Sequence, residues 1–177
     1  CTAPQPVIQQ EQATPVVKLV ATHSIPTPTL KPERRAPEDY AFVVPTSDAI
    51  CLAKTVYGEA SSQLESGQIK VAENVLNRLR KGSWGDTICD VVSYKRKGVS
   101  HYSMYHPEDS NLKRTENAFK NLFDPDVLNA IWVADQTLMY GVRYLPEDSY
   151  NYAAYYVDNE WTRKLTLVER DGDHKFY

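Results

Sequence analysis

The hydrophobic pattern that begins near residue 47 predicts two consecutive helices. Leu52, Val56 and Glu59 follow one another at spacings of four and three, so a helix from Asp48 to Ala60 places them on one face. Ser47 is the expected N-cap of this helix. Its apolar stripe therefore ends on a carboxyl group instead of an apolar side chain.

A second helix is predicted from Glu65 to about Arg80. The sequence Ser62-x-x-Glu65 has the form of a capping box at its start, and Lys81-Gly82 ends it. Its apolar positions are Ile69, Val71, Ala72, Val75, Leu76 and Leu79. A stripe this wide predicts a central helix that is buried on much of its surface, with Glu73 as a surface charge.

Two more helices are predicted after an irregular stretch. Residues 83–110 have no regular period and are expected to form a loop. Apolar positions from Leu112 to Leu122 mark a third helix, which ends before Asp124. Asp124-Pro125 is then the N-cap and first turn of a fourth helix, which ends at Gly141.

The end of the chain changes to a period of two. Leu165 and Leu167 alternate with polar residues, and Asp171-Gly172 is a tight-turn signal before residues 174–177. His174 is expected to fasten this terminal hairpin against the core. The fold class is therefore mainly α (α+β), a helical domain with a small β-hairpin element.

Residues 1–45 differ in composition from the rest of the chain. They hold eight of the eleven prolines and no glycine, which disfavours helices and interior strands. We expect an extended Pro-rich tether or assembly arm over 1–45 and one folded domain over 46–177. The apolar stretch 15–21 could dock on a partner or add as an edge strand, and simple disorder is the alternative.

Charge and hydropathy exclude some classes of partner. The net charge of −3 gives no general basic surface for nucleic acid, and no apolar run approaches the length of a membrane span. Lys95-Arg96-Lys97 is the one basic cluster. Its Ser and Gly neighbours favour a solvated loop over a binding patch, with anionic peptidoglycan as the alternative partner.

Glu59 is the leading candidate for chemistry. A carboxyl group on an apolar face is partly desolvated, which disfavours its charged form and raises its pKa. A carboxylic acid that remains protonated near neutral pH can act as a general acid. The alternative is a glutamate at a frayed helix end that points into water.

A series of short blocks gives this carboxyl group a context. In chain order they are Cys51-Leu52-Ala53, Tyr57-Gly58-Glu59-Ala60, Glu65 to Ala72, Val75-Leu76-Asn77-Arg78, Thr87 to Val92, Tyr102-Ser103, Ala154-Tyr155-Tyr156, Trp161 and Gly172 to Tyr177. From about Cys51 to the last residue, this series resembles the SleB-type cell wall hydrolase family of bacteria and phages. The resemblance implies a lysozyme-like or lytic-transglycosylase-like helical domain that acts on peptidoglycan and needs no cofactor.

The same resemblance implies a reaction. The enzyme would cut the β-1,4 bond between N-acetylmuramic acid and N-acetylglucosamine, with Glu59 as the acid and then the base. Hydrolysis normally needs a second carboxylate, and the sequence offers no obvious one. Lytic transglycosylases instead use the C6 hydroxyl of the sugar, which closes a 1,6-anhydro ring.

The resemblance also implies supporting residues, matched position by position. The residues expected to bind substrate are Tyr57, Asn77, Tyr102, Ser103, Tyr155, Tyr156 and Trp161. Tyr102 and Ser103 could hydrogen-bond an N-acetyl group or the catalytic carboxyl group, and the amide of Asn77 could instead bind backbone. Ser61, Met104 and Ala153 depart from the family pattern, which leaves the preference among sugar subsites open.

The three cysteines bear on the compartment. Cys51 and Cys89 match positions where exported family members often carry cysteine, which implies a disulfide and an oxidising compartment. Two reduced, buried thiols are the alternative. Cys1 is expected to be acylated, as in a periplasmic or outer-membrane lipoprotein, and proteolytic maturation in a phage particle is the competing explanation.

Two other functions stay open at this stage. A zinc amidase could use His101, His106, Glu108, Asp109 and His174, but the chain has no His-Glu-x-x-His motif, so no metal site is predicted. A non-enzymatic module could bind the cell wall or build a virion through residues 1–45. In every case the expected partner is peptidoglycan, and the expected location is outside the cytoplasm.

Overall fold

The computed structural model describes residues 46–106 and 110–177. The predicted tether, Cys1, Glu108 and Asp109 lie outside these described residues. The predictions that rest on them, including the domain boundary at residue 45, therefore stay predictions.

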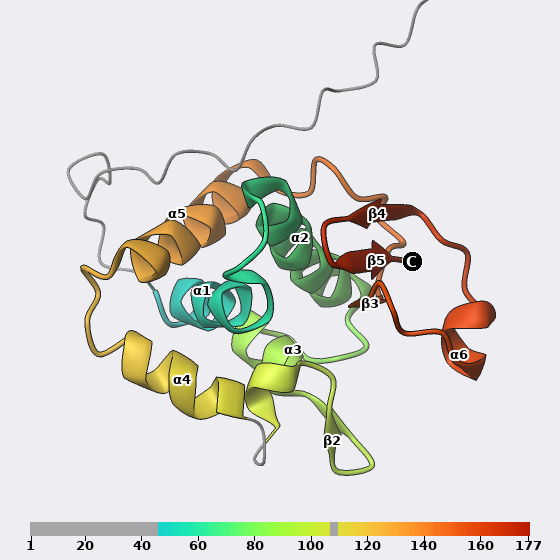
Figure 1. Ribbon diagram of the computed structural model, residues 1–177, viewed down its shortest axis with the longest axis horizontal. Coiled ribbons are helices and arrows are strands. Elements are labelled where there is room, and N and C mark those ends of the chain that lie inside the picture. The colour runs from blue at the N-terminus through green and yellow to red at the C-terminus, as the bar shows by residue number, and fades with distance from the viewer. Residues whose placement is uncertain (1–45, 107–109) are drawn as a thin grey trace, which may run out of the picture.

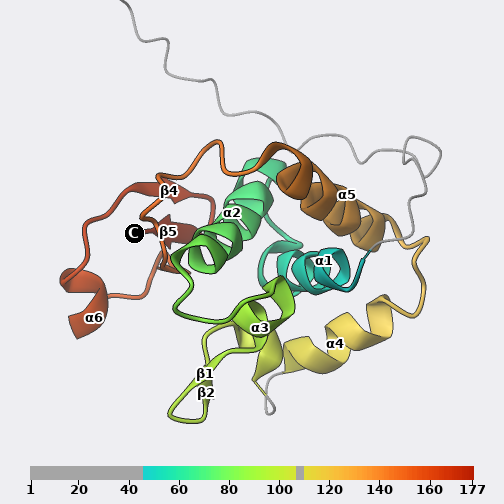
Figure 2. The ribbon, with the colours of Figure 1, turned by 180° about the vertical axis from the view of Figure 1, so that it is seen from behind.

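Helices form most of the described structure, which confirms the mainly α fold class (Figure 1). In chain order they are α1 (Ser47–Ala60), α2 (Glu65–Lys81), α3 (Ile88–Ser93), the 3-10 helix η2 (Ser103–Tyr105), α4 (Ser110–Ala118), α5 (Pro125–Tyr140) and α6 (Glu160–Arg163). The central helix is α1, which packs against α2, α3, α4 and α5. Figures 1 and 2 show α6 on the far side of α2 from α4, so α6 lies away from this bundle.

Two small antiparallel sheets complete the fold. β1 (Lys95–Arg96) pairs with β2 (Val99–Ser100) as a hairpin. β3 (Tyr152–Ala154), β4 (Glu169–Asp171) and β5 (His174–Phe176) form a second sheet in the order β3-β5-β4. In this sheet Tyr152 faces Phe176 and Ala154 faces His174 across the pair β3 and β5.

The main core lies between α1, α2, α3 and α5. Its fully buried side chains include Leu52, Val56, Val75, Val91 and Val133. Tyr102 and Met104 extend this core to η2, so the segment after β2 is fixed to α1 by burial as well as by hydrogen bonds. Removing that much apolar surface from water is the main favourable contribution to this arrangement.

An ion pair fastens the second sheet to α2. Lys70 Nζ lies 2.5 Å from Glu169 Oε1 and 2.8 Å from Asp171 Oδ2, both on β4. Burial lowers the pKa of Lys70, but the hydrogen bonds and charges of these two carboxylates outweigh it and raise the pKa overall. Gln63 adds a second link, because its side chain exchanges hydrogen bonds with Asp173.

The structure corrects the predicted starts of the first two helices. The N-cap of α1 is Thr46, whose hydroxyl accepts from the Ala49 N–H, and Ser47 is already helical. The N-cap of α2 is Leu64, which makes no side-chain cap, so the predicted Ser62 capping box is wrong. The end of α2 is as predicted, with Gly82 in the left-handed conformation that glycine tolerates at φ 69°.

The predicted loop over 83–110 is wrong. It contains α3, the β1–β2 hairpin and η2. The sequence did carry one overlooked signal, since Thr87 and Asp90 form a reciprocal capping box at the start of α3. The helix is only six residues long, which is too short for a period to be recognised.

Two other predictions were partly wrong. The third helix ends at Ala118, so Phe119 and Leu122 lie beyond it, whereas α5 begins and ends as predicted between Asp124 and Gly141. Leu165 and Leu167 lie outside any strand, and the terminal hairpin begins at Glu169. His174 is buried on β5 against Tyr152 and Phe176.

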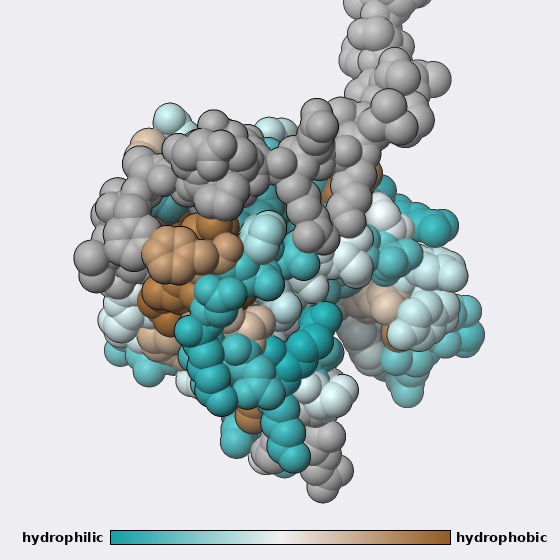
Figure 3. All heavy atoms as spheres, turned by 60° about the vertical axis from the view of Figure 1, so that its left-hand side comes forward, coloured by the Kyte–Doolittle hydropathy of each residue, from teal (hydrophilic) through white to brown (hydrophobic). Residues whose placement is uncertain are grey.

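No helix among the described residues is long and apolar enough to span a membrane. Large apolar side chains are nevertheless exposed after α4 and at the end of α5, where Phe123 and Met139 are 68% and 63% exposed. Figure 3 shows apolar side chains gathered on the face that includes the left-hand side of Figure 1.

Candidate active site

Glu59 lies at the C-terminal end of α1, where three hydrogen-bond donors hold its carboxyl group. Oε1 accepts from the Met104 N–H at 2.9 Å and from the Ser103 hydroxyl at 3.0 Å. Oε2 accepts from the Tyr152 hydroxyl at 3.0 Å. Both oxygens are therefore fixed, by groups from η2 on one side and β3 on the other.

Burial raises the pKa of Glu59 above its ordinary value of 4.5, although the side chain is not fully enclosed. The hydrogen bonds from Met104, Ser103 and Tyr152 each lower the pKa, and they offset only part of this effect. A donated hydrogen bond favours the charged form of a carboxyl group, whereas desolvation disfavours it. The balance keeps the acid form of Glu59 to a higher pH than an exposed glutamate would show.

Gly58 permits the close approach of η2 to this end of α1. A Cβ at Gly58 would lie 2.6 Å from the Cβ of Met104, a distance that real side chains do not reach. Any larger residue would therefore displace Met104 and break the hydrogen bond from its N–H to Glu59. The glycine of the Tyr57-Gly58-Glu59-Ala60 motif is therefore needed for the close packing of η2 against α1 at this site.

A second layer orients the donors. Asn111 Nδ2 on α4 donates to the Ser103 hydroxyl at 3.3 Å, which leaves the Ser103 proton free to point to Glu59. On the other side, the Tyr152 ring packs against Tyr102, His174 and Phe176. Burial, and then the charge of Glu59, raise the pKa of Tyr152 well above its ordinary value, so Tyr152 remains a donor.

Tyr152 is the site residue that sequence reasoning missed. It lies three residues before the predicted pair Tyr155 and Tyr156, outside the matched block. Its position depends on the pairing of β3 with β5, which joins segments about twenty residues apart. The one available signal was the alternation of the strand, and three residues are too few to show it.

Of the predicted site residues, Ser103 binds Glu59 directly, and Tyr57 lies two residues before it on α1. Of the two roles foreseen for Ser103, the structure shows the hydrogen bond to the carboxyl group. Tyr57 is half-buried beside Phe119, with rings perpendicular at 5.9 Å, and the Arg114 guanidinium lies 5.3 Å from its ring centre. Only part of the Tyr57 ring is left for a ligand.

Tyr102 and Asn77 are less accessible than the prediction that they bind substrate supposes. Both are fully buried. The Tyr102 ring stacks under the Arg78 guanidinium at 4.8 Å, and burial raises its pKa to about 12. Asn77 Nδ2 donates to the carbonyls of Pro146 and Ser149, which is the backbone role left open above. In this structure both side chains therefore support the fold behind the site.

Tyr155, Tyr156 and Trp161 lie on the surface beyond β3. They are 45%, 74% and 44% exposed. Tyr155 and Tyr156 meet edge to face at 5.5 Å, and Trp161 packs against Tyr177 at 6.1 Å. Within the described structure these rings form no hydrogen bond or ring contact with Glu59, so they are separate from its immediate shell.

Glu73 corrects another prediction, because it is fully buried and not a surface charge. Its two oxygens accept from the N–H groups of Arg143, Tyr144 and Leu145, at 2.7 to 3.2 Å. These bonds fix the turn that follows α5 against α2. Glu73 is therefore engaged in the fold and offers no free carboxylate to a reaction.

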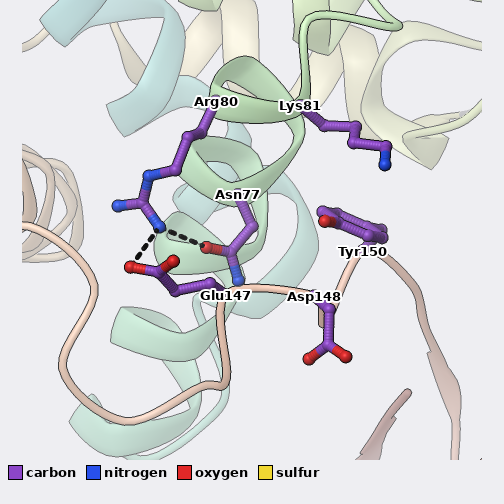
Figure 4. Close-up of a pocket in the computed structure, with 6 residues that line it drawn as sticks. All are labelled: Asn77, Arg80, Lys81, Glu147, Asp148 and Tyr150. Carbon is purple, nitrogen blue, oxygen red and sulfur yellow. Dashed lines mark hydrogen bonds and ion pairs between the residues drawn. The ribbon is translucent and has the colours of Figure 1, made fainter.

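A shallow pocket lies at the C-terminal end of α2 (Figure 4). It is lined by Asn77, Arg80, Lys81, Glu147, Asp148 and Tyr150. Arg80 Nη1 reaches Glu147 Oε1 at 3.2 Å, and Figure 4 shows Lys81 extended toward the Tyr150 ring. The pocket is open to solvent. It does not include Glu59.

The Cys51–Cys89 disulfide is present and joins α1 to α3. This pairing agrees with an oxidising, extracytoplasmic location. No group of three or more His, Cys, Asp and Glu side chains could hold a metal ion among residues 46–106 and 110–177. Glu108 and Asp109, two of the residues considered for zinc, are not part of that range.

No curated protein and no solved structure matches the chain. One family does: the sequence profile described as Cell Wall Hydrolase matches residues 62–177, about two thirds of the chain. The match begins three residues after Glu59, so it includes the donors Ser103, Met104 and Tyr152 but not the carboxyl group itself. The chain belongs to the cell wall hydrolase family, and its substrate is therefore peptidoglycan.

Proposed function

We propose that this protein cleaves the β-1,4 bond between N-acetylmuramic acid and N-acetylglucosamine as a lytic transglycosylase, with Glu59 as its single catalytic carboxyl group. The observation that carries this proposal is the environment of Glu59. A partly accessible carboxyl group with a raised pKa is fixed by three donors in a protein of the cell wall hydrolase family. This is the environment that a general acid needs.

In the proposed reaction, protonated Glu59 first gives its proton to the glycosidic oxygen as the bond to C1 breaks. Positive charge develops on the ring, as in other glycosidases. The Glu59 carboxylate then takes the proton of the C6 hydroxyl of the same muramic acid while O6 bonds to C1. The products are a 1,6-anhydro sugar and a free C4 hydroxyl, and no water is consumed.

The hydrogen bonds around Glu59 suit both halves of this reaction. The Ser103 and Tyr152 hydroxyls and the Met104 N–H stabilise the carboxylate that forms after the first proton transfer. Since they are already in place, little reorganisation is needed. Because burial disfavours that carboxylate, it regains a proton readily from the sugar.

A one-carboxylate mechanism is favoured over hydrolysis because no second carboxylate that could act with Glu59 is found among residues 46–106 and 110–177. The leading causes of the Glu59 pKa shift include no second carboxyl group. Glu73 is occupied by backbone N–H groups, and Glu116 on α4 pairs with Lys54 at 2.9 Å. A glycosidase that activates water would need a second carboxylate within roughly 10 Å.

The remaining expectations join this proposal. Tyr57, Tyr155, Tyr156 and Trp161 would supply ring surfaces to sugars near the cleaved bond. The domain would also have a lysozyme-like fold, as the family resemblance implies. Residues 1–45 would tether the enzyme to a membrane through acylated Cys1, in the periplasm or at the outer membrane, or to a phage particle.

The decisive test is mass spectrometry of purified sacculi digested by the protein. Anhydro-muropeptides that disappear with Glu59→Gln are the expected result. Reducing-end muramic acid would instead identify a hydrolase and call for a second carboxylate. Free stem peptides, lost on addition of a chelator, would identify a zinc amidase, and an undigested sacculus would favour a binding module.

A further inference from the structure

The β1–β2 hairpin carries an uncompensated positive charge beside the candidate site. Lys95, Arg96 and Lys97 are all exposed, and none forms an ion pair with another described residue. No acidic residue occurs in the sequence from Tyr94 to His106. Figures 1 and 2 show the hairpin extending away from the bundle beyond α3.

A tight turn and a rigid base fix the direction of this hairpin. Lys97 and Gly98 occupy the turn with positive φ angles of 53° and 81°, between the pair Arg96 and Val99. At the base, the rings of Tyr94 and His101 meet edge to face at 5.3 Å. Ser100 Oγ donates to the Tyr105 carbonyl at 2.9 Å, which ties β2 to η2.

A buried arginine adds to the positive potential at this base. Arg78 is almost fully buried, with its guanidinium 4.8 Å from the Tyr102 ring centre and 5.5 Å from that of Trp84. Its Nε donates to the Tyr150 carbonyl, its Nη1 has no hydrogen-bond partner, and no described carboxylate neutralises it. Burial, and then the charges of Arg78 and Arg96, lower the pKa of His101.

The base of the hairpin lies close along the chain to Ser103 and Met104, which donate to Glu59. Ser100 ends β2, and Ser103, three residues later, donates to Glu59. Three residues span at most about 11 Å, so the base of the hairpin is within that distance of Ser103. An extended peptide of four residues spans up to about 14 Å, which is longer than this distance to the base of the hairpin.

We infer that the β1–β2 hairpin is a carboxylate-binding surface, on which Lys95, Arg96 and Lys97 bind the peptide stem of the peptidoglycan strand whose glycosidic bond lies at Glu59. The inference rests on the proposed function, since it takes the muramic acid at Glu59 as the point where the stem is attached. The stem carries free carboxylates, and the sugars themselves do not. Exposed cationic side chains with no internal partner are suited to such a ligand.

The test compares binding of two polymers by a non-cleaving protein. Glu59→Gln is the common background, and Lys95→Gln, Arg96→Gln and Lys97→Gln are added together. The probes are intact sacculi and the same sacculi whose free stem carboxylates have been converted to amides with a carbodiimide and ammonia, in a co-sedimentation assay at several salt concentrations. A matched control neutralises Lys120, Arg143 and Lys164, three exposed basic residues outside the hairpin.

We expect the hairpin variant to bind intact sacculi about tenfold more weakly at low salt, since three exposed contacts each contribute a small, salt-screened part. Binding to the amidated sacculi should not change, and the control should bind both polymers as the Glu59→Gln protein does. Equal losses on both polymers, an equal loss in the control, or no loss at all would each overturn the inference.

The outcomes also separate this inference from the proposed function. A carboxylate-dependent loss of binding in the hairpin variant, with no anhydro-muropeptides released by the wild type, would support the hairpin and refute the transglycosylase. Release of anhydro-muropeptides by the wild type, with unchanged binding in the hairpin variant, would refute the hairpin alone.

Discussion

Two regions of this protein each hold a glutamate away from bulk water, and they hold it in different ways. Glu73 is fully buried in the region between α2 and residues 143–145, and backbone N–H groups satisfy it. Glu59 is partly accessible between α1, η2 and β3, and two of its three donors are hydroxyl groups. Of these two glutamates, Glu59 is the one that a ligand can reach, and burial raises its pKa.

The difference shows how a fold separates a structural carboxylate from a reactive one. A carboxylate that is bound by the N–H groups of a fixed turn has a structural role, because removing it would leave several donors unpaired. Side-chain hydroxyls can rotate and can accept as well as donate, so the groups around Glu59 can bind both its protonated and its ionised form. Burial alone therefore does not identify a general acid.

The largest expected effect is the loss of activity in Glu59→Gln. An amide cannot deliver a proton, so kcat/KM on sacculi should fall by about 10³-fold or more, within or above the usual range for general acids. The melting temperature should not fall. The folded-state pKa of Glu59 lies above its ordinary value, so its ionisation costs stability as the pH rises, and the amide removes that cost.

A lower melting temperature for Glu59→Gln at neutral pH, or residual activity near that of the wild type, would contradict this assignment. The same titration predicts a pH profile for the wild type. Activity should be lost as the pH rises through the Glu59 pKa, at a pH above the ordinary value of 4.5, because only the acid form donates.

Glu73→Gln tests the other half of the comparison. The substituted amide presents donor hydrogens to N–H groups of residues 143–145, so the folded state should lose about 2–3 kcal/mol. Thermal unfolding should then show a melting temperature lower by roughly 4–12 °C. Protein that remains folded should still release the same products, and a selective loss of kcat without destabilisation would make Glu73 part of the site.

Gly58→Ala should weaken the hydrogen bonds that hold Glu59 and leave those of Glu73 unchanged. The added Cβ would meet Met104 at 2.6 Å, so η2 must move and its N–H leaves Glu59. We expect kcat/KM to fall by about tenfold, with a stability cost of about 1–3 kcal/mol from overpacking. Gly67→Ala on α2 is the matched control, because its added Cβ would lie no closer than 3.4 Å to Gln63.

Tyr152→Phe should have the smallest effect on rate and a specific effect on the pH profile. The Tyr152 hydrogen bond lowers the pKa of Glu59, so removing it should raise that pKa and shift the alkaline limb of kcat/KM to higher pH. The rate at the optimum should fall by less than about tenfold. Tyr102→Phe is the control, since the Tyr102 hydroxyl contacts Asn74 and not Glu59, and an equal shift there would refute the assignment.

Several features could be predicted from the sequence, because local patterns determine them. The bodies of α1, α2 and α5 follow from their apolar periods, the ends of α2 and α5 from Gly82 and Gly141, and the terminal hairpin from its turn residues. The mainly α fold class, the cell wall hydrolase family and the Cys51–Cys89 pair were likewise predicted correctly.

What the tertiary structure alone decided concerns contacts between distant segments. The sequence could not show that Glu73 turns inward, that Tyr102 and Asn77 are buried, or that Tyr152 reaches Glu59 from β3. A period tells which residues share a face, but not which segment covers that face or where its donors point. The Glu59 pKa depends on that covering, because desolvation and hydrogen bonding are set by neighbours about 45 and 93 residues away along the chain.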